Sequence, residues 1–203
     1  MKLKLTCILL LLFYVACNGC MPSSPYPTIN KYMLDIKTPK KLSTKAPHKN
    51  LMVRNTTIIP QFSNLNFVYR TSKIQYLTDH YNEFYTLPAT LINQTIVKYL
   101  TATKLFHFVT NDDRPIRIKY LLTSKVTELY ADYRNRFQPK AIMTIQFNLF
   151  KINHPDRNIV LLNKTFTATS PLQQKNSQSL VNAWNKDLEI ILRRLSYNLH
   201  RVR

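Results

Sequence analysis

The sequence predicts an α+β domain built on a single mixed, mainly antiparallel sheet, with two helices packed on one face. Two stretches with helical periodicity, 88–103 and 176–199, flank three alternating segments between 116 and 168. Period-two alternation of this length is typical of antiparallel strands that are buried on one face only. Each helix has one apolar stripe, so the economical arrangement places both helices against the same face of the sheet.

Residues 1–16 have the parts of an export signal. Two lysines precede an apolar run, Leu5–Ala16, and a small residue precedes a cysteine twice, at Cys17 and at Cys20. The run is too short to span a bilayer, which takes about 20 apolar residues, but it fits the central part of a signal peptide. Bacterial lipoprotein signals resemble this pattern. We therefore expect a lipid on Cys17, or on Cys20 if the signal extends to residue 19. An ordinary cleaved signal is the alternative.

Cysteine and glycine usage narrows the chemistry of the rest of the chain. All three cysteines lie at or before position 20, so the folded part can form no disulfide, cysteine-based metal site or cysteine nucleophile. The one glycine is Gly19. A P-loop or a dinucleotide fingerprint needs glycine where the backbone approaches phosphate, so both are excluded.

The charge is strongly positive, with 29 lysines and arginines against 10 acidic residues and a net charge of +19. Behind an export signal, such a surface favours anionic lipid headgroups or an acidic protein over nucleic acid. A generally basic surface with no specific partner is an equal alternative.

Residues 17–50 are expected to form a proline-rich tether, and 51–203 the domain. Within the tether, Tyr32-Met33-Leu34 is expected to dock as a short extended segment on the domain edge. The domain should begin with strands at 51–59 and 66–77, followed by an aromatic turn at 79–86. Pro88 suits a first helical turn, so the first helix should run to about Thr103, with a short strand at 105–109.

The three alternating strands are expected at 116–130, 141–149 and 159–168, with a turn at 153–158. In the first strand the apolar side chains occupy even positions up to Tyr130. In the second they occupy odd positions from Ala141 to Leu149. The closing helix should bury one continuous stripe made of Leu180, Trp184, Leu188, Ile191, Leu195 and Leu199.

This order of elements resembles the auxiliary lipoprotein family of ABC-type transport systems, including members that work beside MCE-domain lipid-transfer proteins. The resemblance rests on the Tyr32-Met33-Leu34 patch, on the segment IQYLTDHYNEFYTLP at 74–88, and on the pairs at 99–100 and 105–106. Two positions depart from the family pattern: Tyr85 stands where a Trp is common, and Lys31 where a Tyr is. The resemblance implies a fold like the N-terminal domain of TolB. It also implies assembly with MCE-domain or ABC transporter components, with a homo-oligomeric ring as one form.

Aromatic residues are the best candidates for contacts with a partner, because they are enriched at the centres of protein interfaces. The candidates are Tyr32, Leu34, Tyr76, Tyr81, Phe84 and Tyr85. They form a docking surface or cover the end of the sheet, and the sequence favours neither. His80 lies beside Asp79 and Glu83, where a general base is conceivable, but a solvated turn is the simpler interpretation. We expect no catalytic residues, no metal site and no cofactor.

The sequence therefore indicates a non-enzymatic auxiliary lipoprotein of an envelope lipid-transport system. Asn18 or Met21 follows the lipidated cysteine, and the lack of Asp there indicates the outer membrane, with the domain facing the periplasm. No nucleic acid is expected as a partner. The alternative is a basic surface lipoprotein that binds a polyanion or host ligand, recognised by a steep dependence of binding on salt.

Overall fold

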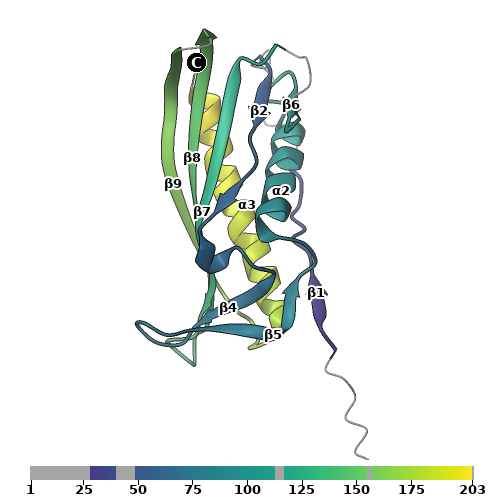
Figure 1. Ribbon diagram of the computed structural model, residues 1–203, viewed down its shortest axis with the longest axis vertical. Helices are drawn as coiled ribbons and strands as arrows, with labels where there is room; N and C mark the ends of the chain where they lie inside the picture. Colours follow the sequence, from purple (N-terminus) through teal and green to yellow (C-terminus); the bar gives the residue numbers. More distant parts are fainter. Residues whose placement is uncertain (1–27, 40–48, 113–116, 155–156, 203) are drawn as a thin grey trace, which may run out of the picture.

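The computed structural model describes residues 28–39, 49–112, 117–154 and 157–202 (Figure 1). The lipidation candidates Cys17 and Cys20 lie outside these ranges. The strands are β1 (Asn30–Tyr32), β2 (Leu51–Val53), β3 (Thr57–Ile58), β4 (Asn66–Arg70), β5 (Tyr76–Phe84), β6 (Val109–Thr110), β7 (Tyr120–Asp132), β8 (Lys140–His154) and β9 (Arg157–Pro171). A short 3-10 helix, η1 (Pro60–Phe62), and two α-helices, α2 (Pro88–Thr103) and α3 (Ser177–Arg201), complete the fold.

The strands form one nine-stranded mixed sheet with β7 at its centre. One edge of β7 pairs antiparallel with β8 over its whole length, and β8 pairs antiparallel with β9. The other edge of β7 is shared along its length by β2, β3 and β4, all parallel to it. The long pairings are thus antiparallel, whereas the short segments that precede β7 in the chain mostly add in parallel.

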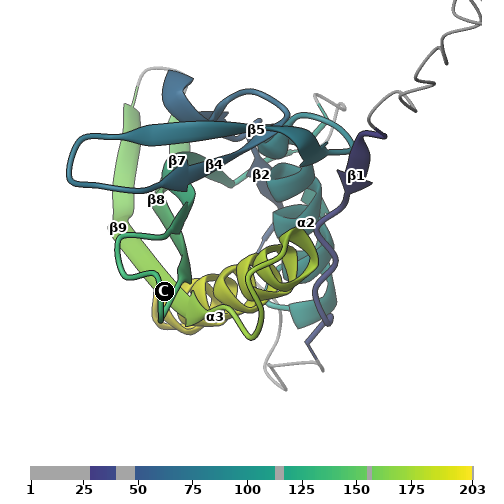
Figure 2. The same ribbon diagram turned by 90° about the horizontal axis from the view of Figure 1, so that it is seen from below.

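The sheet curls, and the two helices close its open side (Figure 2). α3 packs on β8 and β9, and α2 packs beside β2 and β6. The predicted class is therefore correct at the level of a mixed α+β fold with one curled sheet and two helices. Within the described ranges, no helix has the length and apolar character needed to cross a membrane.

The alternation in β8 is confirmed, because Ala141, Met143, Ile145, Phe147 and Leu149 are all buried. In β7 the prediction holds only up to Val126. The register shifts between Val126 and Glu128, and Leu129 then takes the place opposite Met143. A β-bulge moves the following side chains to the other face of the sheet. Tyr130 therefore pairs with Ile142 on the outer face, where Phe62 of η1 covers it at 5.7 Å between ring centroids.

Both predicted helices are confirmed. Pro88 occupies the first turn of α2, where its missing N–H is not needed. The helix ends at Thr103, and the residue that caps it, Lys104, has a φ of 56°. Glycine usually fills this left-handed position, but the domain contains none. The side chain of Asn176 accepts a hydrogen bond from the Ser179 amide and caps α3. All six residues of its predicted stripe are buried.

Four smaller predictions were wrong, three in their boundaries and one in the kind of structure. The expected strand at 51–59 is divided into β2 and β3, and the one at 66–77 contains a turn that separates β4 from β5. Residues 79–86 form no aromatic turn, because Tyr76–Phe84 is a single strand. The short strand near 105–109 occurs at Val109–Thr110. Ile116, the expected start of the first alternating strand, lies outside the described residues.

Candidate functional site

β1 lies against the end of β5 and places two of the predicted docking residues inward. Tyr32 lies opposite Phe84, and the Tyr85 amide donates to the Tyr32 carbonyl oxygen at 2.7 Å. Phe84 is buried, with its ring centroid 4.8 Å from that of Phe67 and 5.3 Å from that of Trp184. Tyr32 is partly buried, 5.4 Å from the ring of Phe67. Phe84 is therefore a core residue in this chain and presents no surface to a partner.

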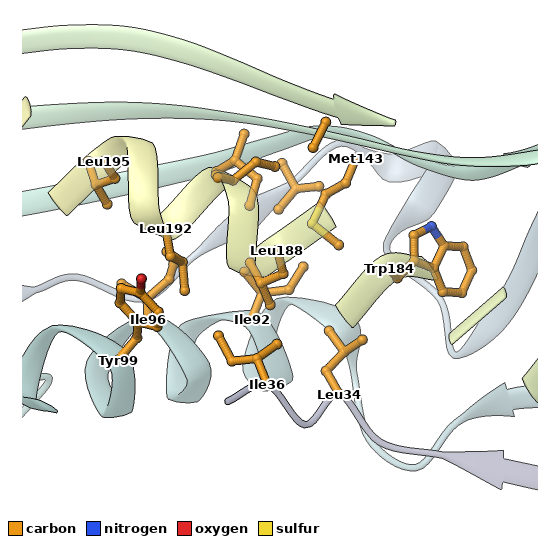
Figure 3. Packing of buried hydrophobic residues seen from close by; sticks show 14 of the residues in the cluster. Leu34, Ile36, Ile92, Ile96, Tyr99, Met143, Trp184, Leu188, Leu192 and Leu195 are labelled. Atoms are coloured by element: carbon orange, nitrogen blue, oxygen red, sulfur yellow. The ribbon is translucent and has the colours of Figure 1, made fainter. Parts of the chain in front are cut away.

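The chain that follows β1 is held by both helices. Leu34 and Ile36 are buried beside residues of α2 and α3 (Figure 3). The Asp35 amide donates to the Asn185 side chain of α3 at 3.0 Å, and Nζ of Lys98 in α2 lies 3.4 Å from the Asp35 carboxylate. The prediction of a short extended segment docked on the domain edge is confirmed, but Leu34 contributes packing and is not exposed for docking.

The opposite side of the β1–β5 pair is exposed, and we call it the edge face: Ile29, Met33, Tyr81 and Tyr85. Each of these side chains is at least half exposed, with Tyr85 at 64%. Side chains alternate along a strand, so the edge face shares its side with Lys31 and Glu83. Those two form an ion pair, with Nζ 3.2 Å from Oε1. The edge face thus combines aromatic and aliphatic surface with a charge pair that is already satisfied.

The Asp79 carboxylate stabilises an irregular section of β5 through hydrogen bonds. The register between β4 and β5 shifts between Asn66 and Val68. The Asp79 carboxylate accepts from the Tyr69 hydroxyl at 2.5 Å and from the amides of Tyr81 and Asn82 at 2.8 and 3.0 Å. Burial acts to raise the pKa of Asp79, but these hydrogen bonds outweigh it and hold the pKa below its ordinary value. Asp79 therefore stabilises the conformation of the strand that carries Tyr81. This structural role explains the hydrogen bonds of Asp79, and a role as partner of a general base at His80 is not needed to explain them.

Tyr76 lies on the outer face of the sheet in a cluster of aromatic rings. Its centroid is 5.7 Å from that of Tyr130 and 6.4 Å from that of Phe62, and the Arg70 guanidinium lies 5.4 Å above its ring. These rings, together with Glu128, line a hollow of about 480 Å³. The Glu128 carboxylate already accepts from the Thr144 and Tyr130 hydroxyls. The hollow is consequently an aromatic surface feature whose polar groups are satisfied within the fold.

One buried acid was missed by the sequence analysis. Asp187 of α3 is fully buried, and burial raises its pKa to about 7, although a hydrogen bond from the Ser170 hydroxyl acts in the opposite direction. A signal was present: Asp187 lies three residues after Trp184 and four before Ile191, so it shares the apolar stripe. Oδ2 of Asp187 has no hydrogen-bond partner within the described residues. Asp187 is fully buried and lies inside the core of the domain.

Among residues 28–39, 49–112, 117–154 and 157–202, no group of three or more His, Cys, Asp or Glu side chains is placed to hold a metal ion. Of the six predicted docking residues, Tyr76, Tyr81 and Tyr85 are exposed and Tyr32 is partly so, whereas Leu34 and Phe84 are buried. Tyr81 and Tyr85 are both exposed residues of the edge face. Tyr76 belongs to the separate aromatic cluster.

No protein-family model matches this chain, and neither does any curated protein. Solved structures do match its fold. Protein XCC0632 from Xanthomonas campestris, assigned to family DUF330, superposes with a TM-score of 0.70 at 16% identity and covers 84% of this chain and 95% of its own. An uncharacterized protein gives a TM-score of 0.60 at 17% identity, over 83% of this chain and 99% of its own.

A more distant match is the hypothetical protein CT253 from Chlamydia trachomatis. Its TM-score is 0.51 at 10% identity, over 77% of this chain and 98% of its own. At such identities a likeness reports the course of the backbone and not the chemistry of a site. This chain therefore has the fold of the DUF330 protein from Xanthomonas campestris.

Proposed function

We propose that this chain is a lipid-anchored envelope lipoprotein whose domain is a non-enzymatic docking or assembly module of an ABC/MCE-type lipid-transport system. The observation that carries the proposal is how the end of the tether joins the domain. β1 adds a strand to β5, and Asp35 is tied to both helices. Such an attachment fixes the place where the segment from the proposed anchor joins the domain.

The anchor itself is proposed from the export signal and the cysteines at its end. Lipidation of Cys17, or alternatively of Cys20, would hold the domain at the outer membrane with its surface in the periplasm. The neutral residues that follow both cysteines support that location. The positive charge of the chain would add attraction to anionic headgroups.

The edge face is the surface we propose for docking a transport partner. Tyr81 and Tyr85 are large, partly apolar side chains with few rotatable bonds, which suits them to the centre of an interface. The Lys31–Glu83 ion pair lies among them with its charges satisfied. An MCE-domain or ABC transporter component is the partner that the family resemblance suggests, and a homo-oligomeric ring is the form of self-assembly that it suggests. A closer likeness to the TolB N-terminal domain is part of the same proposal.

Crosslinking in cells tests the docking role. A photoreactive phenylalanine analogue replaces Tyr85 on the edge face, or Tyr197 on α3 as a matched control. Tyr85 and Tyr197 are 64% and 65% exposed, so their access to solvent is nearly equal. We expect mass spectrometry to identify envelope transport proteins from position 85 and not from position 197. Recovery of the same unrelated proteins from both positions would contradict the proposal.

Fatty-acid labelling tests the anchor separately. We expect label on the unsubstituted chain and its loss in Cys17→Ala, with loss in Cys20→Ala if the second cysteine is used. An unlabelled wild-type chain would contradict the anchor. If the protein instead binds polyanions with a steep salt dependence and position 85 gives no crosslinks to transport proteins, the surface lipoprotein alternative is favoured.

A further inference from the structure

Two turns at one end of the molecule each present a large apolar side chain to solvent. Ile74 lies in the turn between β4 and β5 and is 88% exposed. Phe137 lies in the turn between β7 and β8 and is 94% exposed. We call these two side chains the tip residues. Nothing within the described fold packs on either of them, so their apolar surface is available to something outside the domain.

The two turns are neighbours. The Tyr133 amide, at the start of the β7–β8 turn, donates to the carbonyl oxygen of Arg70, at the end of β4, at 2.8 Å. Between the turns lies a hollow of about 450 Å³, lined among others by Leu77, Arg136 and Lys175. The β4–β5 hairpin and β1 lie toward the same end of the long axis (Figure 1).

The tip residues are surrounded by cations. Residues 71–77, 133–140 and 172–176 contain no acidic side chain, and their basic residues are Lys73, Arg134, Arg136, Lys140 and Lys175. Arg134 lies 2.7 Å from the carboxylate of Asp132, and Lys140 also interacts electrostatically with that carboxylate. Lys73 is adjacent to Ile74 in the chain, and Arg136 is adjacent to Phe137. Each tip therefore combines an apolar side chain with a neighbouring positive charge.

We propose that this end of the domain rests on an anionic lipid bilayer, with Ile74 and Phe137 in the interfacial region and the nearby cations at headgroup phosphates. Apolar and aromatic side chains flanked by Lys and Arg are the composition of surface-binding segments. The inference rests on the proposed lipid anchor. A chain covers at most about 3.6 Å per residue, so the stretch from Cys17 or Cys20 to β1 keeps this end within reach of the membrane.

The arrangement fits a bilayer better than a protein partner. A stable protein interface buries about 800 Å² on each side, with a contiguous apolar centre. Here the two apolar tips stand on separate turns with a hollow between them. A fluid lipid surface accommodates separate tips without shape complementarity, and its phosphates match the excess of positive charge.

Fluorescence quenching by brominated lipids tests the inference on the full chain. The protein is reconstituted in vesicles of phosphatidylethanolamine and phosphatidylglycerol with bromine on the acyl chains. Trp is introduced as Ile74→Trp or Phe137→Trp, with Tyr197→Trp as the control, because Tyr197 lies near the far end of α3. Trp184 is fully buried and provides a constant background. We expect most of the added fluorescence to be lost at positions 74 and 137 and retained at 197.

The charge contribution is tested in the same vesicles. One cation near an anionic surface changes the contact equilibrium about fivefold, so Lys73→Gln or Arg136→Gln should reduce quenching at position 74. Arg193→Gln on α3 should not.

If the fluorescence of neither tip residue is quenched although the chain floats with the vesicles, the inference is wrong and the proposed lipid anchor is retained. If the wild-type chain does not float with the vesicles, both the proposed lipid anchor and the inference about the tip residues are wrong. Equal quenching at 74, 137 and 197 overturns the inference.

Discussion

The Ser170 hydroxyl donates a hydrogen bond to Oδ1 of Asp187 at 2.6 Å, and both side chains are buried where β9 meets α3. The other carboxylate oxygen, Oδ2, has no hydrogen-bond partner within the described residues. Burial raises the pKa of Asp187 to about 7. The group is therefore neutral in mildly acidic solution and charged inside the core in alkaline solution.

Asp187→Asn is expected to flatten the dependence of stability on pH. The folded state keeps the Asp187 proton up to about pH 7, whereas the unfolded chain releases it near the ordinary pKa of 3.8. Between these values the folded state binds more protons, so the wild-type protein loses stability as pH rises through this window. The variant has no such proton to lose. Urea unfolding at intervals between pH 4 and pH 8, chosen to span about this window, measures the difference in slope. Glu189→Gln, on the same helix, is the control, and an unchanged slope in Asp187→Asn would contradict the assignment.

Trp184→Ala is expected to cost about 3–5 kcal/mol of unfolding free energy. Trp184 is fully buried, with its ring 5.1 Å from Phe67 and 5.3 Å from Phe84. Trp184→Phe should cost less, because it keeps an aromatic ring and removes an indole N–H that has no partner among the described residues. Chemical denaturation of both variants provides the comparison. Tyr197→Ala, at an exposed position, should change stability by no more than about 0.5 kcal/mol.

The long, regular elements of this fold were predictable because one periodicity decides each of them. The stripe from Leu180 to Leu199 and the alternation from Ala141 to Leu149 follow directly from the sequence. Tyr130 could not be placed, since a bulge between Val126 and Glu128 reverses the inward face and depends on pairing with β8. The parallel pairing of β1 with β5 was equally hidden, because it joins residues far apart in the chain.

The candidate surfaces were predictable only in part. Aromatic content selected Tyr81 and Tyr85 as candidates without deciding their exposure, and both are exposed. It also selected Phe84, which strand alternation places in the core. Ile74 was expected in the strand at 66–77 but lies in a turn, and Phe137 stands alone in a turn, so the sequence indicated neither as an exposed apolar residue. Only the three-dimensional arrangement brings their turns together.

Leu34→Ala is expected to loosen the attachment of β1. Leu34 is buried, so removing its side chain should cost about 2–3 kcal/mol. The effect should be greatest locally, and hydrogen exchange at the Tyr85 amide, which donates to Tyr32, should become faster. Met33→Ala is a matched control, because Met33 is the preceding residue and is 55% exposed. Equal exchange in the two variants would show that Leu34 does not hold the segment in place.

Asp79→Asn is expected to destabilise the protein at neutral pH and to reduce its sensitivity to acid. Hydrogen bonds to a charged acceptor contribute about 1–3 kcal/mol, and the Asp79 carboxylate accepts them from Tyr69, Tyr81 and Asn82. These bonds hold its pKa below the ordinary 3.8, so this stabilisation is present above that value and is lost as pH falls through the folded-state pKa. Unfolding curves at neutral and acidic pH measure both effects. His80→Ala should leave stability nearly unchanged, because His80 is exposed. A larger loss of stability in His80→Ala than in Asp79→Asn would contradict the structural role of Asp79.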